Sequence, residues 1–584
     1  MKESNWVVAQ EYIDEIAETF PDLPPLVAQL LWNRGVRTQH EGRSFLEPDY
    51  ERDIHDPFLF QHMRRAVDRL RAAIVAQELI VVHGDYDADG ISAASILTHT
   101  LRTLGARVEG FIPHREFDGY GVKHSTIDLL AGRGAQVIIT CDCGISNAPE
   151  IEHARGKNID VIVTDHHAIP EQLPDAYAIL HPKVAGEPYP DKTLSGGGVA
   201  FKLMQGLLQD PETRKLLPAG VNPDGFQKWQ LDLVAISSVA DMVPLVGETR
   251  TLVHYGCMVL GKTRRPGLRA LLARDKIIVT DKGSSAPITP ITIGFKIAPR
   301  INAAGRMDHG KTAFEMLLAD TEPEGQRLAD LLFQHNINRQ KLTEVIVKEA
   351  VAKIKEGGLD TYPVTVVAGE GWPAGVLGLI ASRLKEKFYK PTFVIGINDD
   401  RIVGSGRSID EWNMIAAMQT APQLFTKFGG HPQACGFSLG SIDAIQEFAN
   451  AMYILAEAHV ANITKLIPTI SIDARAQLGD LNWDVLKLLE KFEPYGMGNP
   501  EPRFLAEKMD VVTAAHVGTE GKHMRLMVKN GSPAIKKLMA FNMGEHLGRF
   551  SPGKQLDGVF TFGSNEWNGV KELQYKLHDF RLCE

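Results

Sequence analysis

The sequence contains little cysteine and no long hydrophobic run. Five cysteines among 584 residues make no disulfide framework, and this scarcity indicates a reducing compartment. No apolar run reaches the about 18 residues of a membrane-spanning helix. The N-terminal stretch carries early acids and no long apolar segment, unlike a secretory signal. We therefore expect a cytoplasmic protein without membrane contacts.

An excess of positive charge is also missing. The 72 aspartates and glutamates outnumber the 63 lysines and arginines, for a net charge of −9, so any nucleic-acid contact must come from local patches. Cys141 and Cys143 form a C-x-C pair without a second pair, which argues against a zinc site. The composition, 44% hydrophobic and 23% charged, is ordinary for a globular protein. The length suggests about three or four domains.

Short apolar runs alternate with helical patterns in the first half of the chain. The runs occupy residues 79–83, 108–113, 136–140, 160–164 and 177–181. Strands that are apolar throughout are typical of a parallel sheet covered on both faces, so we expect a doubly wound α/β fold. The predicted domains are an N-terminal helical segment (1–60), the doubly wound domain (61–260), a connector with a long helix (261–357), a second, smaller α/β domain (358–462) and a small β-barrel (463–584).

An acidic loop follows the first of these strands. Its sequence, GDYDADG, places Asp85, Asp87 and Asp89 at alternate positions, where a nucleotide-binding fold would carry glycines. Three carboxylates this close repel phosphate and one another unless divalent cations lie among them. Aspartate is also a good turn residue, so on this loop alone a solvated turn explains the pattern as well as a metal site does.

Two further strands end in similar residues. The third strand leads into Asp142, and the fourth leads into Asp165, His166 and His167. Because the carboxyl ends of parallel strands meet at one edge of a sheet, we expect these side chains to converge with the acidic loop. Carboxylate and imidazole ligands together favour Mn²⁺ or Mg²⁺. Asp241 interrupts another apolar stretch, and taken alone it is better explained as a buried ion pair or a helix cap.

These motifs, in their order along the chain, resemble those of the DHH phosphoesterase superfamily. The resemblance is carried by GDYDADG, the lone DCG, the DHH triplet and VADMVPL. It extends to the RecJ family of single-strand-specific 5′→3′ DNA exonucleases through FKIAPRINAAGRM (295–307), GSGRS (404–408) and FGGHPQACGFS (428–438). The last two motifs resemble the DHH-associated domain. The resemblance covers most of the chain, up to its C-terminus.

The resemblance implies two divalent metal ions, Mn²⁺ or Mg²⁺, in a cleft. Under it, the ligands of one ion are His83, Asp87 and Asp142, and those of the other are Asp89, Asp142, His166 and Asp241. Asp142 is then shared by both ions. Asp85 is expected to orient His83 or a metal-bound water, and His167 to face the scissile phosphate.

A 5′-end-specific enzyme must also grip the terminal phosphate. Arginine suits phosphate because its guanidinium is bidentate, which makes Arg407 the first candidate, with Ser405 or Ser408 as further donors. Gly429 and Gly430 let backbone N–H groups approach an anion, although Gly-Gly is also a plain turn signal. The other candidates for DNA contact are Arg115, Arg300, Arg306, His431 and Tyr86, whose ring either stacks on a base or fills a domain interface.

The C-terminal segment carries local positive charge. Residues 521–584 hold ten Lys/Arg and six Asp/Glu, so this segment is +4 while the rest of the chain is −13. With Phe562, Trp567 and Tyr575 expected to be exposed, it resembles an oligonucleotide-binding (OB) fold, which the family carries here. The alternative is a capping domain with an ordinary mixed surface.

The resemblance implies a single-stranded-DNA-specific exonuclease of DNA repair and recombination. Two metal ions would activate a water for in-line attack, the 3′-oxygen would leave, and 5′-mononucleotides would be released. Two alternatives stay open, a phosphoesterase of small substrates such as cyclic dinucleotides and a non-catalytic DNA-binding scaffold. Single-stranded DNA is the expected ligand. A single-strand-binding protein and a helicase are candidate protein partners, and a monomer is the default state.

Overall fold

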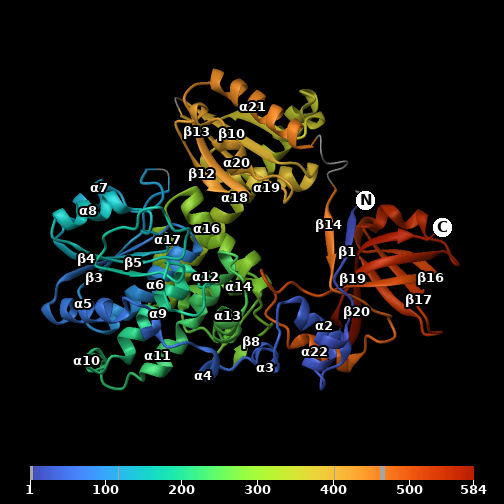
Figure 1. Cartoon of the computed structure of the whole chain (residues 1–584), viewed down its shortest axis with the longest axis horizontal. Coiled ribbons are helices and arrows are strands. Elements are labelled where there is room, and N and C mark those ends of the chain that lie inside the picture. The colour runs from blue at the N-terminus through green and yellow to red at the C-terminus, as the bar shows by residue number, and fades with distance from the viewer. Residues whose placement is uncertain (1–3, 116, 400, 461–466, 568, 584) are drawn as a thin grey trace. The chain divides into compact units, whose positions relative to one another are not determined.

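The computed structural model describes residues 4–115, 117–399, 401–460, 467–567 and 569–583 (Figure 1). The chain forms two compact units. The larger unit comprises His55–Asp241 and Gly256–Ile467, and the smaller comprises Met1–Ile54, Met242–Tyr255 and Pro468–Glu584. Among the described helices, none is long and apolar enough to cross a membrane.

The larger unit begins with a five-stranded parallel sheet. Its strands are β2 (Leu79–Gly84), β3 (Val108–Phe111), β4 (Ala135–Cys141), β5 (Asp160–Thr164) and β6 (Ala178–Leu180), in the order β3-β2-β4-β5-β6. Helices α6 (Ala88–Thr103) and α9 (Gly196–Gln209) cover one face, and α7 (His124–Gly132) and α8 (Ala148–Gly156) cover the other. Coverage of both faces explains the apolar strands and confirms the doubly wound fold.

A 35-residue helix, α18 (Glu322–Glu356), follows this domain and confirms the predicted long helix. Its first half packs against α14 (Pro266–Ala273), α16 (Ala298–Met307) and α17 (Lys311–Leu318). In its second half, Ile346, Ala350 and Ile354 share a hydrophobic cluster with α19 (Ala374–Phe388). Each half of α18 therefore buries an apolar face, the first against the helices of the connector and the second against α19. This packing stabilises the helix over its whole length.

A second, smaller sheet completes the larger unit and confirms the predicted second α/β domain. Its order is β12-β13-β11-β10-β9. The strands are β9 (Thr365–Glu370), β10 (Thr392–Asn398), β11 (Arg401–Arg407), β12 (Lys427–His431) and β13 (Ala434–Leu439). Only β9 and β10 are parallel, with α19 as their crossover, and the other pairs are antiparallel. Helices α20 (Met414–Gln419) and α21 (Asp443–Val460) pack with β11 and β13 in a separate cluster.

The smaller unit contains a β-barrel. Its strands are β15 (Ala474–Arg475), β16 (Arg503–Val517), β17 (His523–Lys529), β18 (Lys536–Ala540), β19 (Gln555–Trp567) and β20 (Val570–Leu582). Pairing of β16 with β19, in addition to the order β15-β16-β17-β18-β20-β19, closes the sheet on itself. Closure confirms the predicted OB-like barrel, because it leaves few unpaired strand edges.

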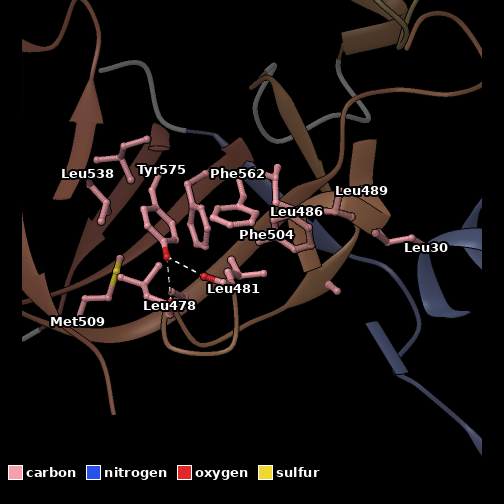
Figure 2. Close-up of a cluster of buried hydrophobic side chains, with 14 of the residues drawn as sticks. Leu30, Leu478, Leu481, Leu486, Leu489, Phe504, Met509, Leu538, Phe562 and Tyr575 are labelled. Carbon is pink, nitrogen blue, oxygen red and sulfur yellow. Dashed lines mark hydrogen bonds between the residues drawn. The ribbon is translucent and has the colours of Figure 1, made fainter. Parts of the chain in front are cut away.

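The aromatic side chains of this barrel differ from the prediction. Phe562 and Tyr575, expected on the surface, are 6% and 2% exposed and belong to the hydrophobic core (Figure 2). The Tyr575 hydroxyl donates to the carbonyls of Leu478 at 3.1 Å and Leu481 at 3.0 Å, which satisfies its polar end inside the core. The side chain of Trp567 lies outside the described part. The prediction of exposed stacking rings is therefore wrong for Phe562 and Tyr575.

The N-terminal segment is part of the same unit as the barrel. Strand β1 (Asn5–Val8) pairs in parallel with β14 (Thr469–Ile472), and helices α1 (Asp14–Thr19), α2 (Pro25–Asn33) and α3 (Gln39–Leu46) share the barrel's core with α22 (Trp483–Glu490). Arg250 is 2% exposed, and its guanidinium donates hydrogen bonds to five main-chain carbonyls, those of Phe45, Lys491, Phe492, Glu493 and Pro494. Residues that are distant in sequence thus form one hydrophobic core.

Candidate active site

The acidic residues lie at the point where the order of the first sheet reverses. In the order β3-β2-β4-β5-β6, β2 is followed along the chain by β3 on one side, whereas β4 is followed by β5 on the other side. Ligands of open α/β sheets bind at such a point, at the carboxyl ends of the strands. The loop after β2 carries Asp85, Asp87 and Asp89, and Asp142 follows β4 directly. The Asp87 side chain caps helix α6 by accepting from the N–H groups of Asp89 at 2.9 Å and Gly90 at 3.1 Å.

Asp142 has an unusual backbone. Its φ of +61° is in the left-handed region, which non-glycine residues adopt rarely and often at functional sites. Its N–H donates to the carbonyl of Thr164 at 2.9 Å, and the residue is 2% exposed. The surrounding sheet therefore holds this carboxylate in one place.

All of the predicted metal ligands except His83 fall into three overlapping groups, each with its ligand atoms within 4.8 Å of one another. The groups are Asp85–Asp87–Asp142, Asp89–His166–Asp241 and Asp142–His166–His167. The Nε2 atom of His166 lies 3.0 Å from Asp142 Oδ1, 3.6 Å from Asp89 Oδ2 and 3.5 Å from Asp241 Oδ2. Asp241 is the C-cap residue of helix α12 (Leu231–Ala240), as the explanation for the residue taken alone expects, and its carboxylate also belongs to the ligand group around His166.

Four polar atoms of this cluster are buried and form no hydrogen bond within the described part of the chain. They are His83 Nε2, Asp85 Oδ1, Asp142 Oδ1 and His166 Nε2. Buried polar atoms are almost always paired, so four orphans in one place need an explanation. Carboxylate oxygens and neutral imidazole nitrogens are the donors that Mn²⁺ and Mg²⁺ accept. The residues thus fit a pair of divalent cations.

Protonation equilibria in the cluster support this fit. Burial, and after it the negative charge of neighbouring aspartates, raises the pKa of Asp85, Asp87 and Asp142, and raises that of Asp241 to about 8. Burial lowers the pKa of His166 to about 4, so its ring is neutral and able to ligate. Bringing these carboxylates together is unfavourable without counter-charge, and divalent cations supply that charge.

His83 lies outside the three ligand groups, and Asp85 lies inside one of them. His83 is fully buried and stacks on Phe111 at 5.3 Å, with its Nδ1 3.8 Å from the Cys143 sulfur. Within the described residues no hydrogen bond joins Asp85 to His83, and Asp85 groups with Asp87 and Asp142 as a ligand candidate in its own right.

The aspartate of the DHH triplet has a role that sequence reasoning left unassigned. Asp165 Oδ1 accepts from the His167 ring Nδ1 at 2.8 Å and from the His166 N–H at 2.7 Å. Burial alone would lower the pKa of His167, but the hydrogen bond to Asp165 and the negative charges of Asp165, Asp241 and Asp89 together outweigh it and raise the pKa to about 9. At Asp165 burial alone would raise the pKa, but the hydrogen bond and charge of His167, together with the N–H groups of Ile145 and His167, outweigh it and lower the pKa to about 2. Because a protonated imidazole cannot ligate a metal, His167 is better placed to donate to substrate than to hold metal.

The N-terminus of α9 is a second feature that sequence reasoning missed. The N–H groups of Gly196 and Gly197 donate to Asp89 at 2.8 and 2.7 Å, and the Ser237 hydroxyl donates to it at 2.5 Å. A Cβ on Gly196 would lie 2.6 Å from Asp142 Cβ, so only glycine allows this approach. The run Ser195-Gly-Gly-Gly, a cap residue followed by three glycines, is the signal that could have revealed it.

A separate cavity of about 780 Å³ lies in the larger unit, and we name it the arginine cavity. Five cationic side chains line it, those of Arg115, Arg306, Arg401, Arg407 and Lys427, and its described lining contains no carboxylate. The predicted Ser405 and Gly429 also line it, whereas Arg401 and Lys427 were not predicted. Arg407 donates to the Ser405 hydroxyl at 3.2 Å, and Arg306 donates to the Gly375 carbonyl at 2.9 Å. Unbalanced positive charge of this kind favours an anionic ligand.

Other predicted DNA contacts are placed elsewhere or are already engaged. Arg300, 6% exposed, forms a two-bond ion pair with Asp275 at 2.6 and 2.9 Å, which leaves it no free face for phosphate. The Ser408 hydroxyl is buried and donates to the Trp412 carbonyl at 2.6 Å. We therefore withdraw both as DNA contacts. Gly430 and His431 end strand β12 but are absent from the described lining of the cavity. The Tyr86 ring is covered by the Arg115 guanidinium, 4.8 Å from its centroid.

Three stretches of the chain match known protein families. Residues 79–238 match the DHH family, N-terminal domain; residues 361–456 match the DHHA1 domain; and residues 472–579 match the RecJ OB domain. The first two ranges enclose the first and second sheets, and the third covers the barrel except for the end of its last strand.

Similar proteins cover nearly the whole chain. The single-stranded-DNA-specific exonuclease RecJ of Bacillus subtilis is 35% identical over 96% of this chain and 68% of its own length. The protein of the same name from Escherichia coli is 32% identical over 96% of both chains. The crystal structure of RecJ from Thermus thermophilus in complex with Mn²⁺ superposes with a TM-score of 0.82 at 27% identity, covering 100% of this chain and 80% of that one.

Proposed function

Because this chain belongs to the RecJ family of single-stranded-DNA-specific exonucleases, we propose that it hydrolyses single-stranded DNA from the 5′ end in a metal-dependent reaction. The products are 5′-mononucleotides, and the activity serves DNA repair and recombination. The observation that carries the proposal is the set of four buried ligand atoms that form no hydrogen bond within the described residues, at the switch point of the first sheet.

The residues divide into metal ligands and groups that act on substrate. We assign one cation to His83, Asp85, Asp87 and Asp142, and the other to Asp89, Asp142, His166 and Asp241. When bound, two Mn²⁺ or Mg²⁺ ions lower the pKa of a water and neutralise charge on the phosphate. The α9 N-terminus and Ser237 hold Asp89 in place for this purpose.

His167 is the group that meets the scissile phosphate in this proposal. Asp165 fixes the orientation of its ring and keeps it protonated near neutral pH, so it can donate to a phosphoryl oxygen as negative charge develops there. The Tyr120 hydroxyl lies 3.1 Å from His167 Nδ1 and donates to the Asp142 carbonyl at 3.2 Å, which adds a second restraint.

The arginine cavity is the proposed seat of the 5′-terminal phosphate. Arg407 and Ser405 supply donors from β11, and Arg115 and Arg306 add charge from other elements of the same unit. A strand anchored there by its end would present its first phosphodiester bond at a constant distance from the anchor. Such anchoring accounts for 5′ polarity and for products of one nucleotide.

The remaining parts of the proposal concern DNA and protein partners. The match to a RecJ OB domain supports binding of single-stranded DNA by the barrel, and affinity should fall steeply as salt is raised. A cytoplasmic setting is supported by the small number of cysteines, five in the sequence, which form no disulfide in the described part of the chain. Contacts with a single-strand-binding protein and a helicase, and a monomeric state, stay predictions.

The test is end-labelled digestion of single- and double-stranded DNA with Mn²⁺, Mg²⁺ or chelator. We expect 5′ label to leave first as a mononucleotide, only from single strands and only with metal. Asp142→Ala should lower turnover by about a thousandfold or more while DNA binding persists, because it removes a ligand that both cations share. The matched control is Asp128→Ala, an exposed aspartate on α7. Turnover by the Asp142 variant close to that of the control would refute the assignment.

A further inference from the structure

The arginine cavity is longer than one terminal phosphate requires. Alternate residues of β11, namely Arg401, Val403, Ser405 and Arg407, lie on one face of the second sheet and all line the cavity. At about 3.3 Å per residue, Arg401 is about 20 Å along the strand from Arg407. The cavity is thus a trough that runs along the sheet, with an arginine at each end.

Small residues form the floor and wall of this trough. Ser405 pairs with Gly436 of β13, which in turn pairs with Gly429 of β12, so the middle of the floor has almost no side chains. Gly375 and Gly378 of α19 form a wall, and a Cβ on Gly378 would lie 2.7 Å from the Arg407 guanidinium. A bulky group beyond the first phosphate therefore meets open space.

The far end of the trough carries its own positive charge. Lys427 of β12 pairs with Ser438 of β13, and Ser438 pairs with Val403 of β11. Lys427 is therefore level with Val403, which lies about 7 Å along β11 from Ser405. Neither Arg401 nor Lys427 has an ion-pair partner in the described part of the chain, and both line the cavity. Helix α19 adds the positive end of its dipole, since Ala374 and Gly375 of its first turn also line the cavity.

Size and charge together identify the class of ligand. A volume of about 780 Å³ is in the range that holds a ligand of nucleotide size, well above a single phosphate. Five cations facing no carboxylate in the described lining repel one another, and the two negative charges of one terminal phosphate leave most of that repulsion in place. A chain of phosphates that extends from Ser405 towards Val403 would place negative charge within reach of the Lys427 and Arg401 side chains.

We propose that Arg401 and Lys427 form a second anion subsite, which accepts the outer phosphates of a single strand with a 5′-diphosphate or 5′-triphosphate end. This inference rests on the proposed exonuclease function. The reaction itself is unchanged: one water adds to the phosphorus of the second nucleotide, the bond from that phosphorus to the 3′-oxygen breaks, and the proton goes to the 3′-oxygen. The first nucleotide therefore leaves as a nucleoside 5′-triphosphate, and the remaining strand keeps a 5′-monophosphate.

The experiment compares oligo-dT strands that differ only in their 5′ end: triphosphate, monophosphate or hydroxyl. Each carries a fluorophore at its 3′ end for the rate, and anion-exchange chromatography identifies the first product. We expect the triphosphate strand to be degraded at least as efficiently as the monophosphate strand, with dTTP as its first product. The double variant Arg401→Ala/Lys427→Ala should lower kcat/KM about tenfold for the triphosphate strand, while its rate on the monophosphate strand stays within about twofold.

Control variants separate this inference from the function it rests on. Lys348→Ala removes an exposed lysine of α18 that does not line the trough, and should change neither rate. Degradation of the monophosphate strand with the triphosphate strand left intact would overturn the subsite. So would pyrophosphate as the first product, or an equal loss on both strands in the double variant. Failure to degrade any of the three strands with metal present would overturn the exonuclease function, and this inference with it.

Discussion

Replacing Gly196 by alanine should damage the metal centre while leaving the fold intact. Gly196 is the first residue of α9, and a Cβ there would lie 2.6 Å from Asp142 Cβ and 2.8 Å from its Cγ and Oδ1. Ordinary contacts of a Cβ atom are 3.4–4 Å. The Asp142 carboxylate must therefore shift by roughly 0.6–0.8 Å, or α9 must retreat by as much.

Neither partner can move without loss. Asp142 is held by its left-handed backbone and by the hydrogen bond of its N–H to Thr164. Helix α9 is held by the bonds that Gly196 and Gly197 donate to Asp89. Either movement displaces a proposed ligand. We expect apparent Mn²⁺ affinity to fall about 10- to 100-fold, and the rate at saturating metal to fall about 100-fold because the reacting groups are misplaced by a fraction of an ångström.

Gly198→Ala is the matched control, on the same helix two residues along. A Cβ there would lie 3.2 Å from Leu194 Cδ2, so the end of a flexible side chain has to give by only a few tenths of an ångström. Both variants gain the same helix propensity, about 1 kcal/mol relative to glycine, so their difference isolates the clash. The measurements are calorimetric Mn²⁺ titration of metal-free protein, initial exonuclease rate against Mn²⁺ concentration, and thermal unfolding. Equal Mn²⁺ affinity in the two variants would refute the reasoning.

Three further predictions concern stability. The pKa of His167 is raised from 6.5 to about 9, and that of Asp165 is lowered from 3.8 to about 2, so their pair stabilises the fold fully between about pH 4 and 6.5 and loses that contribution as pH rises through about 9. In denaturant unfolding of the metal-free protein, Asp165→Asn should lower the free energy of unfolding at pH 6, and this loss should shrink by pH 10. A loss that is the same at both pH values would contradict the prediction. Arg250→Met leaves buried carbonyls unpaired and should lower the free energy of unfolding of the smaller unit by about 3 kcal/mol or more, as measured by urea unfolding. A decrease below about 1 kcal/mol would count against the role of this side chain. Tyr575→Phe removes the donor to two core carbonyls and should cost about 1–3 kcal/mol in the same assay, whereas an exposed stacking ring would cost almost nothing and would instead weaken DNA binding.

Most of the proposed metal ligands were predictable because they stand at strand ends that the sequence makes visible. The apolar runs before Asp85, Asp142 and Asp165 predict strands, and parallel strands place their carboxyl ends along one edge. Convergence at that edge needs only local pattern and sheet geometry. Asp241 shows the limit, because its own surroundings favoured an ordinary buried pair until His166 was found beside it.

Residues that act through long-range contacts were missed or misassigned. Gly196 and Ser237 approach Asp89 across more than a hundred residues of sequence, and no local pattern connects them. Arg300 and Arg401 are the same residue type, but Arg300 forms a buried ion pair with Asp275 whereas Arg401 lines the arginine cavity. What an arginine does depends on whether a carboxylate already faces it.

The same division holds for the whole chain. Its pattern of apolar runs, helical periods and acidic strand ends determines a doubly wound domain, a long helix, a second sheet, a barrel and the chemistry of the metal centre, since these follow from short-range spacing. Tertiary structure alone decides that Phe562 and Tyr575 fill the barrel, that the N-terminal helices α1 to α3 share its core, and that five cations meet in one trough. The reason is physical: burial and charge pairing depend on neighbours that arrive from anywhere in the chain, and a sequence pattern records only those a few residues away.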